Sequence, residues 1–119
     1  MAVNYASDKA RIQSELMKLA RAGKVTYYGV LGATLKKHPQ WPGWTIVLGE
    51  ILLEQAQRGE PDITSVLLRT EGWPGQIDGV ATKGRPTHTQ RLRAQAKLDE
   101  VFRRYCPGKG TLRLPQRKK

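Results

Sequence analysis

The chain has 119 residues, of which 39% are hydrophobic and 26% charged, and its formal net charge is +11. These values are typical of one globular domain and exclude a largely disordered chain. The lone cysteine, Cys106, excludes an internal disulfide and a thiolate zinc cage. No stretch approaches the ~20 apolar residues of a membrane span. Residues 1–6 show no secretory signal, so we expect a cytoplasmic protein without a membrane partner.

The excess positive charge is concentrated in the last third of the chain. Residues 81–119 hold twelve Lys and Arg but only two acids, Asp99 and Glu100, which gives +10 of the total charge. Such a density favours a polyanionic partner, and nucleic acid is the commonest, because its phosphates bind Lys and Arg through counterion release. An anionic membrane, an acidic protein and a merely solubilising segment are the alternatives.

Two helices are predicted in the first third of the chain. Asp8 favours a helix start and Gly23 a helix end, so the first helix spans residues 8–22. One face of this helix carries its apolar side chains, Ile12, Leu16 and Leu19. Thr26 can cap a second helix over residues 27–37.

The third predicted helix is the most apolar part of the chain. Two prolines and a glycine in residues 38–43 end the second helix, and Thr45 can cap the third, which ends at Gly59. Its apolar residues cover more than one face, so we expect it near the centre of the core. Glu50 and Glu54 are its expected exposed positions.

A β-hairpin is predicted next. Residues 63–69 are β-branched and leucine-rich, residues 71–75 are typical of a turn, and residues 76–81 suggest a second strand. Trp73 would lie at the exposed hairpin tip, where it could stack on bases or enter a groove. Trp44, beside the apolar third helix, is expected in the core.

The last predicted helix is basic and runs from a cap at Thr87 or Thr89 to about Cys106. Its inward stripe consists of Ala94, Leu98, Val101, Phe102 and Tyr105. We expect residues 107–119 to form a basic flexible tail. The order helix, helix, helix, hairpin, helix predicts an α+β fold, with residues 1–106 as one small winged-helix-like domain.

Two short motifs carry a resemblance to a known family. Tyr28-Gly29-Val30-Leu31-Gly32 and Val47-Leu48-Gly49-Glu50-Ile51-Leu52 resemble the "YGELA" and "VG-x-AL" segments of DNA alkyltransferases and alkyltransferase-like proteins. The resemblance implies a winged-helix DNA-binding module. It does not imply repair chemistry, because Pro61-Asp62-Ile63-Thr64-Ser65-Val66 stands where that family has "PCHRV" or "PWHRV". Thr45 and Ile46 stand where the family places a base-displacing arginine.

Candidate catalytic residues are few. No histidine is placed by a motif to activate Cys106, and His38 and His88 are too far apart in sequence to form a helical zinc pair. Asp62 and Glu71 suggest a metal-dependent nuclease, but no lysine follows Glu71 at the required spacing. No glycine-rich phosphate loop is present. We therefore expect no enzyme and no cofactor, and keep the nuclease as a third hypothesis.

The basic residues are the strongest candidates for a binding site, and we expect them to bind phosphates without sequence specificity. The predicted nucleic-acid contacts are Lys83, Arg85, Arg91, Arg93, Lys97, Arg104, Lys109, Arg113, Arg117 and Trp73. We expect a non-catalytic protein that binds double-stranded DNA rather than RNA. The alternative is a small protein-interaction module, an inhibitor or adaptor of an acidic partner or a nucleic-acid enzyme.

Overall fold

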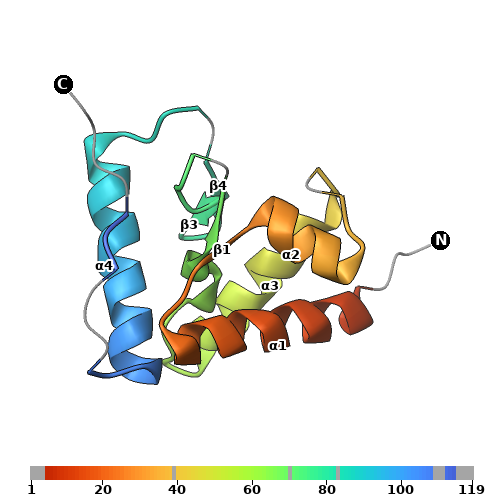
Figure 1. Ribbon diagram of the computed structural model, residues 1–119, viewed down its shortest axis with the longest axis horizontal. Coiled ribbons are helices and arrows are strands. Elements are labelled where there is room, and N and C mark those ends of the chain that lie inside the picture. The colour runs from red at the N-terminus through yellow and green to blue at the C-terminus, as the bar shows by residue number, and fades with distance from the viewer. Residues whose placement is uncertain (1–4, 39, 70, 83, 109–111, 115–119) are drawn as a thin grey trace.

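The computed structural model describes residues 5–38, 40–69, 71–82, 84–108 and 112–114. They form a small α+β domain in which helices dominate and the strands are two residues long (Figure 1). In chain order the described elements are α1 (Ala6–Ala22), β1 (Thr26–Tyr27), α2 (Tyr28–Leu35), α3 (Gly43–Gln57), the 3-10 helix η1 (Ile63–Val66), β2 (Leu67–Leu68), β3 (Gln76–Ile77), β4 (Val80–Ala81) and α4 (His88–Tyr105).

The hydrophobic core lies where α1, α3 and α4 meet the segment formed by η1 and β2. In residues 63–68 no residue is more than 2% exposed. The helices contribute the buried side chains Ile12, Leu16, Val47, Leu48, Ile51, Leu98 and Val101. Gln55 is also buried, and its Oε1 accepts a hydrogen bond from the Ile63 backbone N–H at 2.9 Å. Since burial of each aliphatic side chain contributes about 1.5–3 kcal/mol, this cluster holds the three long helices together.

The predicted C-terminal cap of α1 and the predicted N-terminal cap of α4 are right, whereas α1 begins at Ala6, two residues before the predicted start at Asp8. Gly23 ends α1 in the left-handed conformation, with φ of 68°. Thr87 begins α4 with a capping box: its side chain accepts from the Gln90 N–H, and the Gln90 side chain accepts from the Thr87 N–H. The predicted inward stripe of α4 is also confirmed, with Ala94, Leu98, Val101 and Phe102 buried and Tyr105 partly buried.

The predicted caps of α2 and α3 are wrong. Thr26 lies in β1, where it pairs with Leu67 instead of capping a helix. Thr45 lies inside α3, which begins two residues earlier at Gly43. Packing requires a glycine at the first position of α3, because the Trp41 ring lies against Gly43, where a Cβ would be only 2.2 Å from a ring carbon. Trp44 is buried, as expected.

The predicted long hairpin is also wrong. Asp62 caps η1 by accepting from the Thr64 N–H, so residues 63–66 turn as a 3-10 helix and do not extend as a strand. β2 then pairs in parallel with β1, and an isolated bridge joins Leu68 to Pro74, which lies in the predicted turn and not in the predicted second strand. The observed hairpin is β3–β4, with Asp78 and Gly79 at its turn and both φ angles positive. Positive φ at both central residues is the pattern of a type I′ turn, for which Asp-Gly is one of the preferred sequences.

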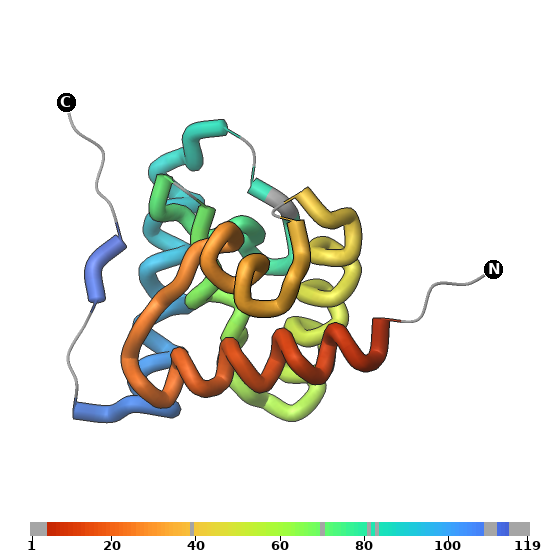
Figure 2. The backbone as a smooth tube through the Cα atoms, turned by 45° about the vertical axis from the view of Figure 1, so that its right-hand side comes forward, coloured from red at the N-terminus to blue at the C-terminus, as the bar shows by residue number. Residues whose placement is uncertain are grey.

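Part of the predicted tail is packed against the domain. The Leu114 N–H donates to Gln95 Oε1 at 2.8 Å, and Gln95 Nε2 donates to the Leu112 carbonyl at 2.9 Å. Leu114 is only 3% exposed. The prediction of a flexible tail from residue 107 onward is therefore wrong for residues 112–114, which Figure 2 shows beside α4.

Candidate nucleic-acid interface

Trp73 cannot act as an exposed wedge. It is only 9% exposed, and the Arg91 guanidinium lies 5.9 Å from its ring centroid. Its carbonyl accepts a hydrogen bond from the Arg69 N–H at 2.6 Å. The prediction placed Trp73 at a hairpin tip, but the tip is at Asp78, five residues later. Trp73 is consequently a buried residue at the edge of the hydrophobic core.

Two of the predicted phosphate contacts, Arg93 and Lys97, are engaged in ion pairs. Lys97 is 6% exposed, and its Nζ lies 2.7 Å from Asp78 and 3.1 Å from Asp62. Arg93 donates two hydrogen bonds to Asp78, at 2.9 and 3.0 Å. The hydrogen bonds from Arg93 and Lys97 lower the pKa of Asp78 to about 2. Two cations and two carboxylates thus neutralise one another, and the prediction of an exposed Lys97 is wrong.

The same cluster bears on the nuclease hypothesis. The structure brings Lys97 to Asp62 and Asp78, whereas Glu71 pairs with Arg69 at 3.0 Å. Asp62 Oδ1 accepts from both the N–H and the hydroxyl of Thr64, so both of its oxygens are occupied. Across the described residues, no three His, Cys, Asp or Glu side chains group as a metal would require. These contacts tie α4 to η1 and the β3–β4 turn.

The remaining predicted residues divide into three groups. Arg85, Arg104 and Arg113 are exposed, and within the part of the chain that the structure describes none of them has a carboxylate at ion-pair distance. Arg91 is half-buried and donates to the Pro86 carbonyl at 3.0 Å, so its orientation is fixed beside Trp73. The third group, Lys83, Lys109 and Arg117, lies outside the described residues.

Four exposed cations gather where α1 and α4 end. Arg21 and Lys24 lie at the end of α1, and Arg103 and Arg104 lie in the last turn of α4. The two helix ends are neighbours in both views (Figures 1 and 2). Among described residues, no carboxylate pairs with any of the four. We call these four residues the basic end.

Tyr105, the last residue of α4, lies close enough to the ends of both α1 and α4 for charged groups on each helix to affect its pKa. Burial raises the pKa of its hydroxyl and Glu60 adds to the rise, while Arg104 and Arg21 act in the opposite direction. The Arg104 guanidinium also lies 6.0 Å from the Tyr105 ring centroid. Two acids line the same groove as Arg103 and Arg104: Glu60, which lies 3.7 Å from Arg58, and Glu100. The basic end therefore keeps a net positive charge.

Sequence reasoning missed Arg21, Lys24 and Arg103 as contacts. Arg21 was recognisable as a basic residue in a last helical turn, where the helix dipole favours a cation. Its proximity to Arg104, which is 83 positions later in the chain, depends on the packing of α1 against α4. Nothing in the local sequence carries that information.

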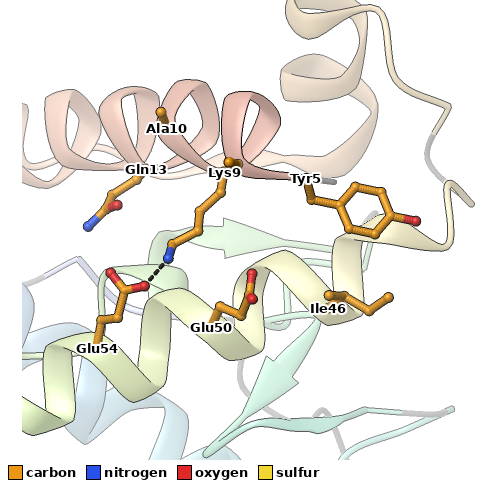
Figure 3. A pocket seen from close by; sticks show the side chains of 8 residues that line it. Tyr5, Lys9, Ala10, Gln13, Ile46, Glu50 and Glu54 are labelled. Atoms are coloured by element: carbon orange, nitrogen blue, oxygen red, sulfur yellow. Dashed lines mark hydrogen bonds and ion pairs between the residues drawn. The ribbon is translucent and has the colours of Figure 1, made fainter. Parts of the chain in front are cut away.

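A surface groove with a volume of about 740 Å³ lies between α1 and α3 (Figure 3). Tyr5, Ala10 and Ile46 contribute apolar surface. Glu54 of α3 was expected to be exposed. It is only partly exposed and forms an ion pair with Lys9 of α1. Glu50 is exposed, as expected, and gives the groove a negative charge that would repel phosphate.

No protein-family model, curated protein or solved structure matches this chain. None of the described helices is both long enough and apolar enough to cross a bilayer.

Proposed function

We propose that this chain is a non-catalytic nucleic-acid-binding protein that holds the phosphate backbone of double-stranded DNA with its basic end. The observation that carries the proposal is the position of Arg21, Lys24, Arg103 and Arg104: all four are exposed, adjacent and without an acidic partner in the described residues. Clustered cations on one surface bind a polyanion by releasing its condensed counterions. Outside the basic end, two exposed arginines add positive charge: Arg85, in the segment before α4, and Arg113, whose neighbours in the chain are hydrogen-bonded to Gln95 of α4.

The winged-helix-like assignment belongs to this proposal. Its support is the order of elements, with three helices followed by a short hairpin and a last helix. In such modules the third helix usually enters the major groove. Here α3 has no Lys or Arg from Gly43 to Gln57, and Glu50 is exposed on it. We therefore assign the DNA contact to the basic end and not to α3, and expect binding with little sequence preference.

The test is fluorescence anisotropy of labelled duplex DNA, single-stranded DNA and RNA at about 50 and 200 mM salt. The informative variant is the double substitution Arg103→Gln, Arg104→Gln. We expect it to weaken binding to unrelated duplexes equally and to reduce the slope of log affinity against log salt by about 2. Charge substitution is cleaner than truncation of residues 107–119, because truncation would also remove the buried Leu114.

The matched control is Arg11→Gln, Lys36→Gln, which removes two exposed cations that also lack an ion pair within the described residues but lie outside the basic end. It should reduce affinity less than the test variant does. Equal losses in the two variants would show that total charge matters and the basic end does not. Absence of binding at low salt would overturn the proposal and favour an acidic protein partner.

A further inference from the structure

α3 carries a second apolar face, directed away from the core. Its inward face is formed by Trp44, Val47, Leu48, Ile51 and Gln55, all buried. On the other side Ile46 and Leu53 are 50% and 59% exposed. Gly49 and Ala56 lie between and beyond them on the same side of the helix, and the exposed Glu50, four residues after Ile46, borders this stripe. Two exposed branched aliphatic side chains, about two turns apart, thus lie on one side of α3.

The stripe has the spacing of a helix–helix seam. Ile46, Gly49, Leu53 and Ala56 follow one another at intervals of three, four and three residues, as seam positions do in paired helices. Large and small residues alternate along it. When two copies of α3 run antiparallel, Ile46 lies opposite Ala56 of the other copy and Leu53 lies opposite Gly49. Both pairings belong to one register, with a twofold axis near Ile51.

Electrostatic repulsion between the two basic ends also favours the antiparallel orientation. The C-terminal end of α3 lies close to the basic end. Glu60, three residues past Gln57, is near enough to Tyr105 for its negative charge to help raise the pKa of the Tyr105 hydroxyl. A parallel pair would bring two basic ends together. An antiparallel pair separates them by roughly the length of a 15-residue helix, about 22 Å, which is beyond the Debye length of about 8 Å at physiological salt.

The flanks of the stripe complete the surface. On one side Val80 of β4 is 67% exposed, and the neighbouring Gly79 approaches Leu52 of α3 so closely that a Cβ there would lie 3.2 Å from the Leu52 methyl. Leu52 and Val80 thereby extend the apolar area. On the other side Glu50 lies at the edge of the groove between α1 and α3 (Figure 3). Near a twofold axis at Ile51, the two Glu50 carboxylates would approach each other and weaken the pairing.

We propose that the outer face of α3 is the interface of a twofold homodimer, with the two α3 helices antiparallel and Leu53 of each chain seated on Gly49 of the other. The proposed contacts between the two chains include no residue of the basic end, so dimerisation does not depend on DNA binding; the basic end enters only as a charge that disfavours the parallel orientation. A stripe this short predicts a weak dimer, with a dissociation constant on the order of micromolar.

The test is sedimentation equilibrium of the full chain between about 1 and 500 μM. We expect concentration-dependent dimerisation that Leu53→Glu abolishes and Glu50→Gln strengthens several-fold. Leu92→Glu is the matched control, because Leu92 is also a leucine 59% exposed on a helix, but on α4. Circular dichroism establishes that each variant is folded. A wild-type chain that is monomeric throughout, or a dimer that Leu92→Glu disrupts and Leu53→Glu does not, would overturn the proposal.

The register has its own test. In a Cys106→Ser background, Glu50→Cys places one thiol beside the proposed axis, so mild oxidation should yield a disulfide-linked dimer. Leu92→Cys in the same background should remain monomeric. Efficient cross-linking of the Leu92→Cys chain, with none from Glu50→Cys, would contradict the antiparallel arrangement.

Discussion

Lys97 of α4 donates a hydrogen bond to Asp78 at the β3–β4 turn across 2.7 Å. The same ammonium lies 3.1 Å from Asp62, which caps η1. One lysine therefore joins three elements that are distant in sequence, and its position is only 6% exposed. This arrangement explains why the most basic helix of the chain has less charge for a ligand than its composition suggests.

Replacement of Lys97 should be severe for stability. Lys97→Ala leaves the Asp62 carboxylate buried without its cation, and loss of one partner of a buried pair costs about 3–5 kcal/mol in the free energy of unfolding. Urea denaturation followed by circular dichroism measures this change. Arg103→Ala, a loss of positive charge at an exposed position of the same helix, should change stability by less than about 0.5 kcal/mol. Similar losses for the two variants would refute the role of the ion pairs.

The lowered pKa of Asp78 predicts how the stability of the fold changes at acidic pH. Its pKa is lowered from 3.8 to about 2 by hydrogen bonds from Arg93 and Lys97. A carboxyl whose pKa is depressed in the folded state stabilises the fold above its unfolded pKa, and this contribution is lost as pH falls toward the folded pKa. The stability difference between wild type and Asp78→Asn should accordingly shrink between pH 4 and pH 2. Unfolding curves across that range measure it, and a difference independent of pH would contradict the assignment.

Two glycines of α2 should respond oppositely to alanine. A Cβ at Gly32 would lie 2.3 Å from the Lys37 carbonyl oxygen, which belongs to the backbone and cannot rotate away. Gly32→Ala should therefore destabilise the domain by about 1–3 kcal/mol. A Cβ at Gly29 meets nothing within 4 Å, so Gly29→Ala should stabilise α2 by up to about 1 kcal/mol. Thermal unfolding of the two single variants decides this, and destabilisation by both would show that α2 needs glycine for another reason.

The helices were predictable from sequence because their signals are local. The capping box at Thr87 and Gln90 and the apolar spacing of α4 both act within a few residues. Strand pairing was not predictable in this way, because β2 takes its partner from residues about forty positions earlier. Lys97 looked exposed for the same reason: its two acidic partners come from other elements. Two local signals were overlooked: the cap of η1 at Asp62 and the Asp78-Gly79 turn.

Gln95 should control the attachment of the C-terminal segment. Its amide donates to the Leu112 carbonyl and accepts from the Leu114 N–H, so a single side chain holds both residues that flank Arg113. Proteolysis requires a locally released backbone, and these hydrogen bonds oppose that release. Gln95→Ala should accelerate tryptic cleavage after Arg113 several-fold.

Mass spectrometry of the early cleavage products, taken together with a melting curve, separates local release from global unfolding. The midpoint of thermal unfolding should shift little, because Gln95 lies outside the buried apolar cluster. Gln90→Ala is the control on the same helix, since it removes a side chain that caps the start of α4 and does not contact residues 112–114 in the described structure. Unchanged cleavage after Arg113 in Gln95→Ala would mean that Leu114, buried against the core, holds the segment by itself.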